Sequence, residues 1–213
     1  MPAVVREWTI LLLSAIWLGS IGIASAGEPT EVIRQTTDQV SKILEDPGLQ
    51  GPAKQAERQA RLHQIAEQVF DWQAMAQRSL GVHWRGRTPQ QRQEFVGLFR
   101  DLVERTYMSR LEAATQEKQD IQYVGEQVDG SRAAVKTNVV TKRNQQVPIE
   151  YRMQKTDGRW KVYDVLVEGI SLVNNYRSQF NQIISSSSYD ALVQKMKSRQ
   201  GDELSAGPQR KAP

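Results

Sequence analysis

The sequence predicts an α+β domain in which helices cover one face of an antiparallel four-stranded sheet. Apolar residues recur at helical spacing in residues 30–111, alternate with polar residues in 119–167, and return to helical spacing after residue 171. Tight-turn dipeptides separate the alternating runs, as in a meander of hairpins. A sheet that curls against helices can leave an apolar hollow, although an apolar strand face more often forms dry core.

The chain begins with a predicted export signal, residues 1–26. Arg6 precedes an apolar run that ends at Ile23, and Ala-Ser-Ala then supplies the small residues that a signal peptidase accepts. The run is shorter than the roughly 20 residues that span a bilayer. The chain has no cysteine to carry the acyl chains of a lipoprotein. We therefore expect a domain over residues 27–200 in the periplasm, followed by a disordered tail over 201–213.

Composition excludes several classes of protein. The formal net charge of +4 is mixed along the chain, which is too weak a bias to indicate a nucleic-acid partner. The absence of cysteine excludes disulfides, thiolate catalysis and cysteine-ligated metals. The sequence also contains no nucleophile elbow, phosphate-binding loop, dinucleotide fingerprint or zinc-protease motif. We therefore expect neither catalytic activity nor a cofactor.

Four helical segments are expected before the sheet. The first, residues 30–44, ends at an Asp-Pro-Gly breaker, and the second spans 55–70. Asp71 can cap a third segment that reaches Leu80. The fourth begins after Thr88, where Thr-Pro-Gln-Gln provides a capping hydroxyl, a proline at the first helical position and a glutamine at the third.

Four strands are expected between Ile121 and Val167, joined by three short turns. The turn dipeptides are Asp129-Gly130, the weaker Asn144-Gln145, and Asp157-Gly158. Gly169 then ends the last strand, and Ser171 can cap a helix whose Tyr176 packs inward. A final short helix follows Ser188.

Few residues have the chemistry of a catalytic or metal site. A metal site built on both histidines would bring His63 and His83 together, but ordinary, partly exposed histidines are the better interpretation. Asp164 interrupts an apolar row and is either a desolvated general base or, as we prefer, an aspartate held by backbone N–H groups or at a bulge. Arg177 can meet a phosphate, pair with Asp164 or remain solvated. The other scattered arginines from Arg78 onward indicate a solvated face or a docking surface.

Two long segments resemble the signature of the MlaC family. One reads WKVYDVLVEGISLVNNYRSQF from Trp160, and the other reads LGVHWR from Leu80, then TPQQRQEFVGLF from Thr88 and RTY from Arg105. The resemblance extends over about residues 30–200. That family includes toluene-tolerance auxiliary proteins.

The resemblance implies a carrier of phospholipid that shuttles between an outer-membrane lipoprotein complex and an inner-membrane ABC transporter. One branch of the family is associated with hopanoid pathways, so another lipid cargo stays open. We expect a monomer without a nucleic-acid partner. Two alternatives are an adaptor that binds periplasmic proteins but no lipid, and a small-molecule enzyme with Asp164 as its base.

The same resemblance implies an internal apolar pocket for acyl chains, with the headgroup largely in water. We expect this pocket between one sheet face and the helices, although each of its residues could equally be dry core. The predicted lining residues are Val139, Tyr151 and Met153 on the sheet, Met75, Leu80, Phe99, Val103 and Tyr107 on the helices, and Val165, Val167 and Ile170 near the mouth.

Overall fold

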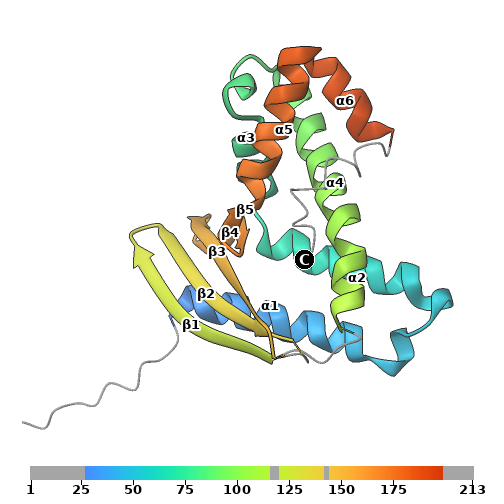
Figure 1. Cartoon of the computed structure of the whole chain (residues 1–213), viewed down its shortest axis with the longest axis vertical. Helices are drawn as coiled ribbons and strands as arrows, with labels where there is room; N and C mark the ends of the chain where they lie inside the picture. Colours follow the sequence, from blue (N-terminus) through green and yellow to red (C-terminus); the bar gives the residue numbers. More distant parts are fainter. Residues whose placement is uncertain (1–26, 116–119, 142–143, 199–213) are drawn as a thin grey trace, which may run out of the picture.

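A computed structural model describes residues 27–115, 120–141 and 144–198 (Figure 1). The predicted export signal and C-terminal tail lie outside the described residues. Among the helices of the described part, none is both long and apolar enough to cross a membrane. The helices are α1 (Glu28–Glu45), α2 (Gln55–Val69), α3 (Trp72–Leu80), α4 (Pro89–Thr115), α5 (Leu172–Ser186) and α6 (Tyr189–Lys197), with short 3-10 turns η1 (Pro47–Leu49), η2 (Pro52–Lys54) and η3 (Gly81–Trp84).

The sheet is an antiparallel meander in the order β1-β2-β3-β4-β5. Its strands are β1 (Asp120–Asp129), β2 (Arg132–Val140), β3 (Gln146–Thr156), β4 (Arg159–Val167) and β5 (Ile170–Ser171). The expectation of four strands is therefore wrong by one. Glu168 and Gly169 both adopt positive φ, which turns the chain back onto β4 for two residues. A two-residue strand has no alternation that a sequence pattern could reveal.

Strand β4 contains a bulge that reverses its side-chain phase. Met153 pairs with Val162, but the adjacent Arg152 pairs with Asp164, so Tyr163 is the extra residue. As a result Val162 and Val165 both pack toward the same group of apolar side chains, although they are three residues apart. Asp164 consequently leaves the apolar face that a regular strand would give it.

The helix starts follow the predicted capping chemistry. The Asp71 carboxylate accepts a 2.9 Å hydrogen bond from the Ala74 N–H at the start of α3. The Gln91 N–H donates to the Thr88 hydroxyl, and the Thr88 N–H donates to the Gln91 side chain, which forms a reciprocal capping box. These local bonds satisfy N–H groups that have no partner within the helix.

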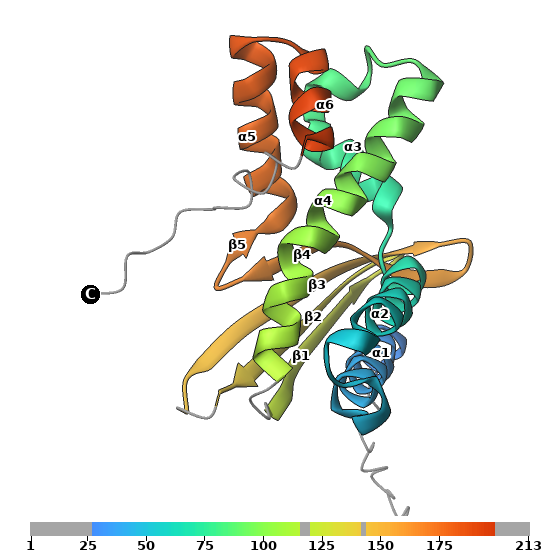
Figure 2. The same cartoon turned by 90° about the vertical axis from the view of Figure 1, so that its right-hand side faces the viewer.

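The elements form a sheet flanked by helices, with a helical lobe beyond one end of it (Figures 1 and 2). Helices α1, α2 and the second half of α4 lie on one side of the sheet in Figure 2. The helical lobe consists of α3, η3, the first half of α4, α5 and α6. Helix α4 thus belongs to both parts, because it runs from the lobe down across the sheet.

Candidate functional site

The apolar core is divided into two groups of buried side chains. The sheet cluster joins α1 and α2 to the strands and consists of Ile33, Val69, Ala133, Val135, Met153, Trp160 and Val162. The helical cluster fills the lobe and consists of Trp72, Met75, Ala76, Leu80, Trp84, Phe95, Phe99, Leu102, Val103, Val173, Tyr176, Phe180, Tyr189, Leu192, Val193 and Met196. Phe70 packs against both clusters and lies 5.0 Å from the Trp72 ring, measured between centroids.

The helical residues predicted to line a pocket lie together in the lobe. Met75, Leu80, Phe99 and Val103 are buried in the helical cluster, and Tyr107 packs against it. Phe99 is enclosed by aromatic rings, with edge-on contacts to Tyr176 and Phe180 at 5.5 and 6.3 Å between centroids. Val103 and Tyr107 lie in the second half of α4, which crosses the sheet in Figure 2.

The lining residues predicted on the sheet differ more in burial than those predicted on the helices. Met153 is buried in the sheet cluster, and Tyr151 and Val165 pack against it. Val139 is half-buried toward the end of β2. Val167 and Ile170 pair across the β4–β5 turn and are 42% and 54% exposed. The structure therefore places ten of the eleven predicted residues in two clusters and at an exposed edge rather than in one continuous lining, and Val139 lies outside these groups.

Two open hollows on the described surface lie elsewhere. One of about 500 Å³ lies between α1 and α2 and is lined by Gln39, Lys42, Ile43, Arg61, Gln64, Ile65 and Gln68. The other, of about 510 Å³, lies on the sheet and includes Arg132, Arg152 and Tyr163. Neither contains any of the predicted lining residues, and both carry charged side chains that suit acyl chains poorly.

Phe70 and Trp72 lie where the two clusters meet, and the sequence analysis did not place them among the lining residues. Phe70 bridges to Val162 as an isolated parallel pair, and the Asp71 N–H donates to the Val162 carbonyl at 2.8 Å. The Trp72 indole N–H is buried without a hydrogen-bond partner among the described residues. The two aromatic residues on either side of the helix-capping Asp71 were the only sequence feature that pointed to this position. Their contact with β4 joins segments about 90 residues apart, which a local pattern cannot show.

Asp164 has a structural role in this fold. Its carboxylate accepts hydrogen bonds from the Ser171 hydroxyl at 2.6 Å and from the Val173 N–H at 3.1 Å. The guanidinium of Arg152 lies 3.8 Å away. The bulge and the backbone N–H bond confirm the preferred interpretation, and the carboxylate is fully occupied in joining β4 to α5.

Of the three alternatives given for Arg177, pairing with Asp164 is not the one that the structure shows. Arg152, the cross-strand neighbour of Asp164, provides the cation instead. Arg177 is exposed, and its aliphatic stem lies against Gly81, where an added methyl group would be 3.2 Å from the Arg177 Cδ. Gly81 has a φ of +58° at the end of α3, so this turn suits glycine. Tyr176, by contrast, is buried as predicted.

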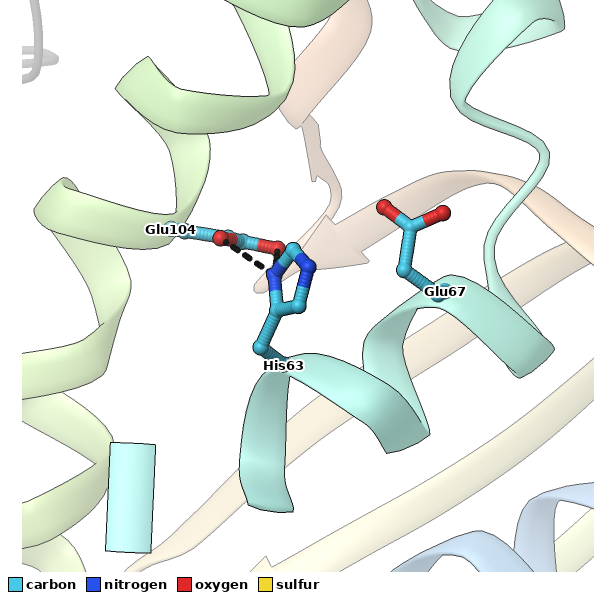
Figure 3. Close-up of side chains that lie close together, drawn as sticks. All are labelled: His63, Glu67 and Glu104. Atoms are coloured by element: carbon cyan, nitrogen blue, oxygen red, sulfur yellow. Dashed lines mark hydrogen bonds and ion pairs between the residues drawn. The ribbon is translucent and has the colours of Figure 1, made fainter. Parts of the chain in front are cut away.

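The two histidines do not form a common metal site. His83 bonds to Asn181, whereas His63 Nδ1 lies 2.9 Å from the Glu104 carboxylate. Figure 3 shows the His63 ring between the carboxylates of Glu104 on α4 and Glu67 on α2. Potential ligand atoms of these three residues lie within 4.8 Å of one another.

A cation lies beside this cluster and pairs with one of its carboxylates. Arg100 donates to the Glu67 carboxylate at 3.1 Å and also pairs with Asp101. Burial raises the pKa of Glu104, and the hydrogen bond with His63 opposes that rise. The arrangement is therefore a polar link between α2 and α4. It ties a helix beside the sheet to the helix that carries Val103 and Tyr107.

Fold and site together define a class: an α+β protein with a divided apolar core, in which Asp164 and Glu104 make contacts between elements. Residues 34–198 match the family model described as MlaC protein. The chain belongs to the MlaC family.

Named relatives agree with this assignment. The chain is 26% identical over 121 residues to the intermembrane phospholipid transport system binding protein MlaC of Haemophilus influenzae, covering 55% of this chain and 56% of that protein. It thus spans little more than half the length of that relative. It is 25% identical over 189 residues to toluene tolerance protein ttg2D of Pseudomonas putida, covering 84% of this chain and 82% of the relative.

A solved structure shares the fold. The phospholipid-binding protein of Ralstonia solanacearum, determined in complex with a phospholipid, matches with a TM-score of 0.69 and 26% identity. The match covers 84% of this chain and 99% of that chain.

Proposed function

We propose that this chain is a periplasmic carrier of phospholipid whose acyl chains lie between the sheet cluster and the helical cluster. The observation that carries the proposal is the divided core, in a chain whose fold matches a protein solved with bound phospholipid. Each buried methylene contributes about 0.8 kcal/mol, so two acyl chains bind with little need for headgroup recognition.

The proposed walls are the sheet face bearing Tyr151 and Val165 and the part of α4 bearing Val103 and Tyr107. Tyr151 and Val165 belong to the edge of the sheet cluster, and Tyr107 belongs to the edge of the helical cluster. The buried indole N–H of Trp72, which has no partner among the described residues, offers a donor to an ester carbonyl of the lipid. Separation of the walls exposes apolar surface, so release requires a partner that opens the pocket or competes for the chains.

By family membership, the partners would be an outer-membrane lipoprotein complex and an inner-membrane ABC transporter. The chain would receive lipid at one and deliver it at the other, as a monomer and without catalysis. The names of relatives support the transport role, since one is a binding protein of a phospholipid transport system.

Native mass spectrometry of protein purified gently from the periplasm tests the cargo. A bound mass that fragments as a phospholipid supports the proposal, and a hopanoid would correct the cargo while keeping the carrier role. Protein that is folded yet free of lipid in every preparation would favour an adaptor.

Substitutions that fill the space between the proposed walls test where the acyl chains bind. Val165→Trp on β4 and Tyr107→Trp on α4 should lower the lipid bound per folded protein. Val124→Trp is the matched control, because Val124 is 55% exposed on β1. Photo-crosslinking groups at Tyr107, Tyr151 and Val165 should trap lipid. Equal lipid occupancy in all variants, with folding intact, would place the acyl chains elsewhere.

A further inference from the structure

One end of the helical lobe is built from two segments that together are rich in arginine. Residues 72–93 and 169–189 contain five arginines and no aspartate, glutamate or lysine. The two segments pack together, since α3 and η3 lie against α5 (Figure 1). The His83 ring bonds to Asn181, and Arg177 covers Gly81, so these contacts tie the two segments side by side.

Several cations elsewhere in the described structure are ion-paired, although Lys136 and Arg159 on the sheet are not. Pairs such as Arg34 with Glu31, Arg61 with Glu57 and Lys155 with Glu28 neutralise cations on the other elements. No ion pair within the described residues involves any of the five. Three of them are held by neutral groups: Arg78 stacks on Tyr163, Arg87 on Tyr189, and Arg92 donates to backbone carbonyls.

Arg85 and Arg177 are the exposed members, and Val82 accompanies them. Val82 is 81% exposed, the highest value among the large apolar residues described as exposed. It lies on η3, which also bears the Gly81 contact of Arg177. We define the arginine face as Val82, Arg85 and Arg177. The acidic residues that border the two segments are Asp71, Glu94, Glu168 and Asp190, of which Asp71 caps α3 and Glu94 is paired with Lys197.

We propose that the arginine face docks on the surface of a bilayer containing anionic phospholipid. Guanidinium groups bind phosphate oxygens in a forked geometry, and an exposed aliphatic side chain enters the interfacial layer. A standard protein interface needs a core of several buried apolar or aromatic residues, which one valine does not supply. The charge and the single apolar residue therefore fit a lipid surface better than an acidic protein surface.

Cosedimentation of the mature protein with vesicles tests this docking. The protein should bind vesicles of equimolar phosphatidylcholine and phosphatidylglycerol, bind vesicles of phosphatidylcholine alone far less, and dissociate as salt rises. The double variant Arg85→Glu/Arg177→Glu should bind the anionic vesicles at least about 25-fold more weakly, since each arginine near such a surface contributes about fivefold and each glutamate adds repulsion. Val82→Ser should weaken binding further.

The matched control is Lys136→Glu/Arg159→Glu, which makes the same charge change at exposed positions of the sheet. This control should keep most of the binding. Equal losses in the two double variants, or equal binding to both kinds of vesicle, would overturn the proposal. So would unchanged vesicle binding by the Arg85/Arg177 variant combined with loss of lipid exchange, which would indicate an acidic protein partner.

Two further measurements separate docking from folding and from cargo binding. Thermal unfolding of each variant reports on folding, and Arg85→Gln/Arg177→Gln provides a milder change if charge reversal lowers stability. Lipid bound to the Arg85→Glu/Arg177→Glu variant, read by native mass spectrometry, should equal that of the unmodified protein. Loss of that lipid in both proteins would contradict the carrier function without bearing on docking.

Discussion

Asp164 accepts a 2.6 Å hydrogen bond from the hydroxyl of Ser171, and this bond holds the last long strand against the start of α5. The Ser171 oxygen accepts in turn from the Asn174 N–H and thereby caps the helix. One buried carboxylate therefore orders a strand, a tight turn and a helix start. The cooperative chain of bonds strengthens each member.

Replacing this carboxylate should destabilise the protein without emptying its binding site. Asp164→Ala leaves the buried Val173 N–H without its acceptor, and we expect a loss of about 2–3 kcal/mol in the free energy of unfolding. Urea unfolding measures it, with Asp38→Ala on the exposed face of α1 as control. Lipid bound per folded molecule should stay constant. A fall in bound lipid at unchanged stability would instead place Asp164 in the ligand site.

The choice of Arg152 over Arg177 as the partner of Asp164 predicts unequal effects of two alanine substitutions. Arg152 is partly exposed and bridges Glu150 and Asp164, so Arg152→Ala should cost about 1 kcal/mol. Arg177→Ala should change stability by no more than about 0.5 kcal/mol, as expected for a surface side chain. Thermal unfolding of the two variants under one set of conditions compares them. A larger effect at Arg177 would contradict this assignment.

Gly81 should tolerate a methyl group poorly. Gly81→Ala forces an L-residue to φ +58° and brings its Cβ within 3.2 Å of Arg177, so we expect a loss of about 1–3 kcal/mol. Gly97 offers a contrast within α4, because a Cβ there meets nothing within 4 Å. Gly97→Ala should stabilise the helix by about 0.5–1 kcal/mol. Calorimetry on both variants should therefore give shifts of opposite sign.

Deprotonation of Glu104 should lower the stability of the folded protein as pH rises. Because burial raises the pKa of Glu104 above its ordinary value of 4.5, the folded state retains the proton longer than the unfolded state. Its contribution is fully present below pH 4.5 and is lost as pH rises through the folded-state pKa. Urea unfolding over this range should show a smaller decline for Glu104→Gln. The exposed Glu45→Gln is the control, and identical pH profiles for all three proteins would refute this account.

Tyr151 should lose its phenolic proton only in strongly alkaline solution. Burial raises the pKa of Tyr151 from 10.0 to about 12, so folding favours its neutral phenol. The corresponding stability, up to about 3 kcal/mol, is present below pH 10 and is lost as pH rises toward 12. Phenolate absorbance should show a late step that Tyr151→Phe removes. Its persistence in that variant would assign the late step to another tyrosine.

Much of the local structure could be predicted because its signals lie within a few residues of one another. The Thr88 capping box and the Asp157-Gly158 turn act over three residues or fewer, and both occur where expected. The start of α5 at its Ser171 cap was likewise predicted from one hydroxyl. Helical and alternating spacing also located the main helices and the four long strands. The family was assigned from sequence similarity, because the spacing of apolar residues does not identify a family.

Contacts between distant segments required the tertiary structure. Apolar spacing identified Phe99 and Met153 as inward-facing, but it could not show that they belong to different clusters. The β4 bulge depends on pairing with β3, and the His63–Glu104 contact joins two helices separated by a long stretch of chain. By itself the sequence determined which elements form and which side chains are apolar, because hydrophobic spacing and capping bonds are local. Only the tertiary structure decided which faces meet, because packing selects partners by shape and by the satisfaction of buried polar groups across the whole chain.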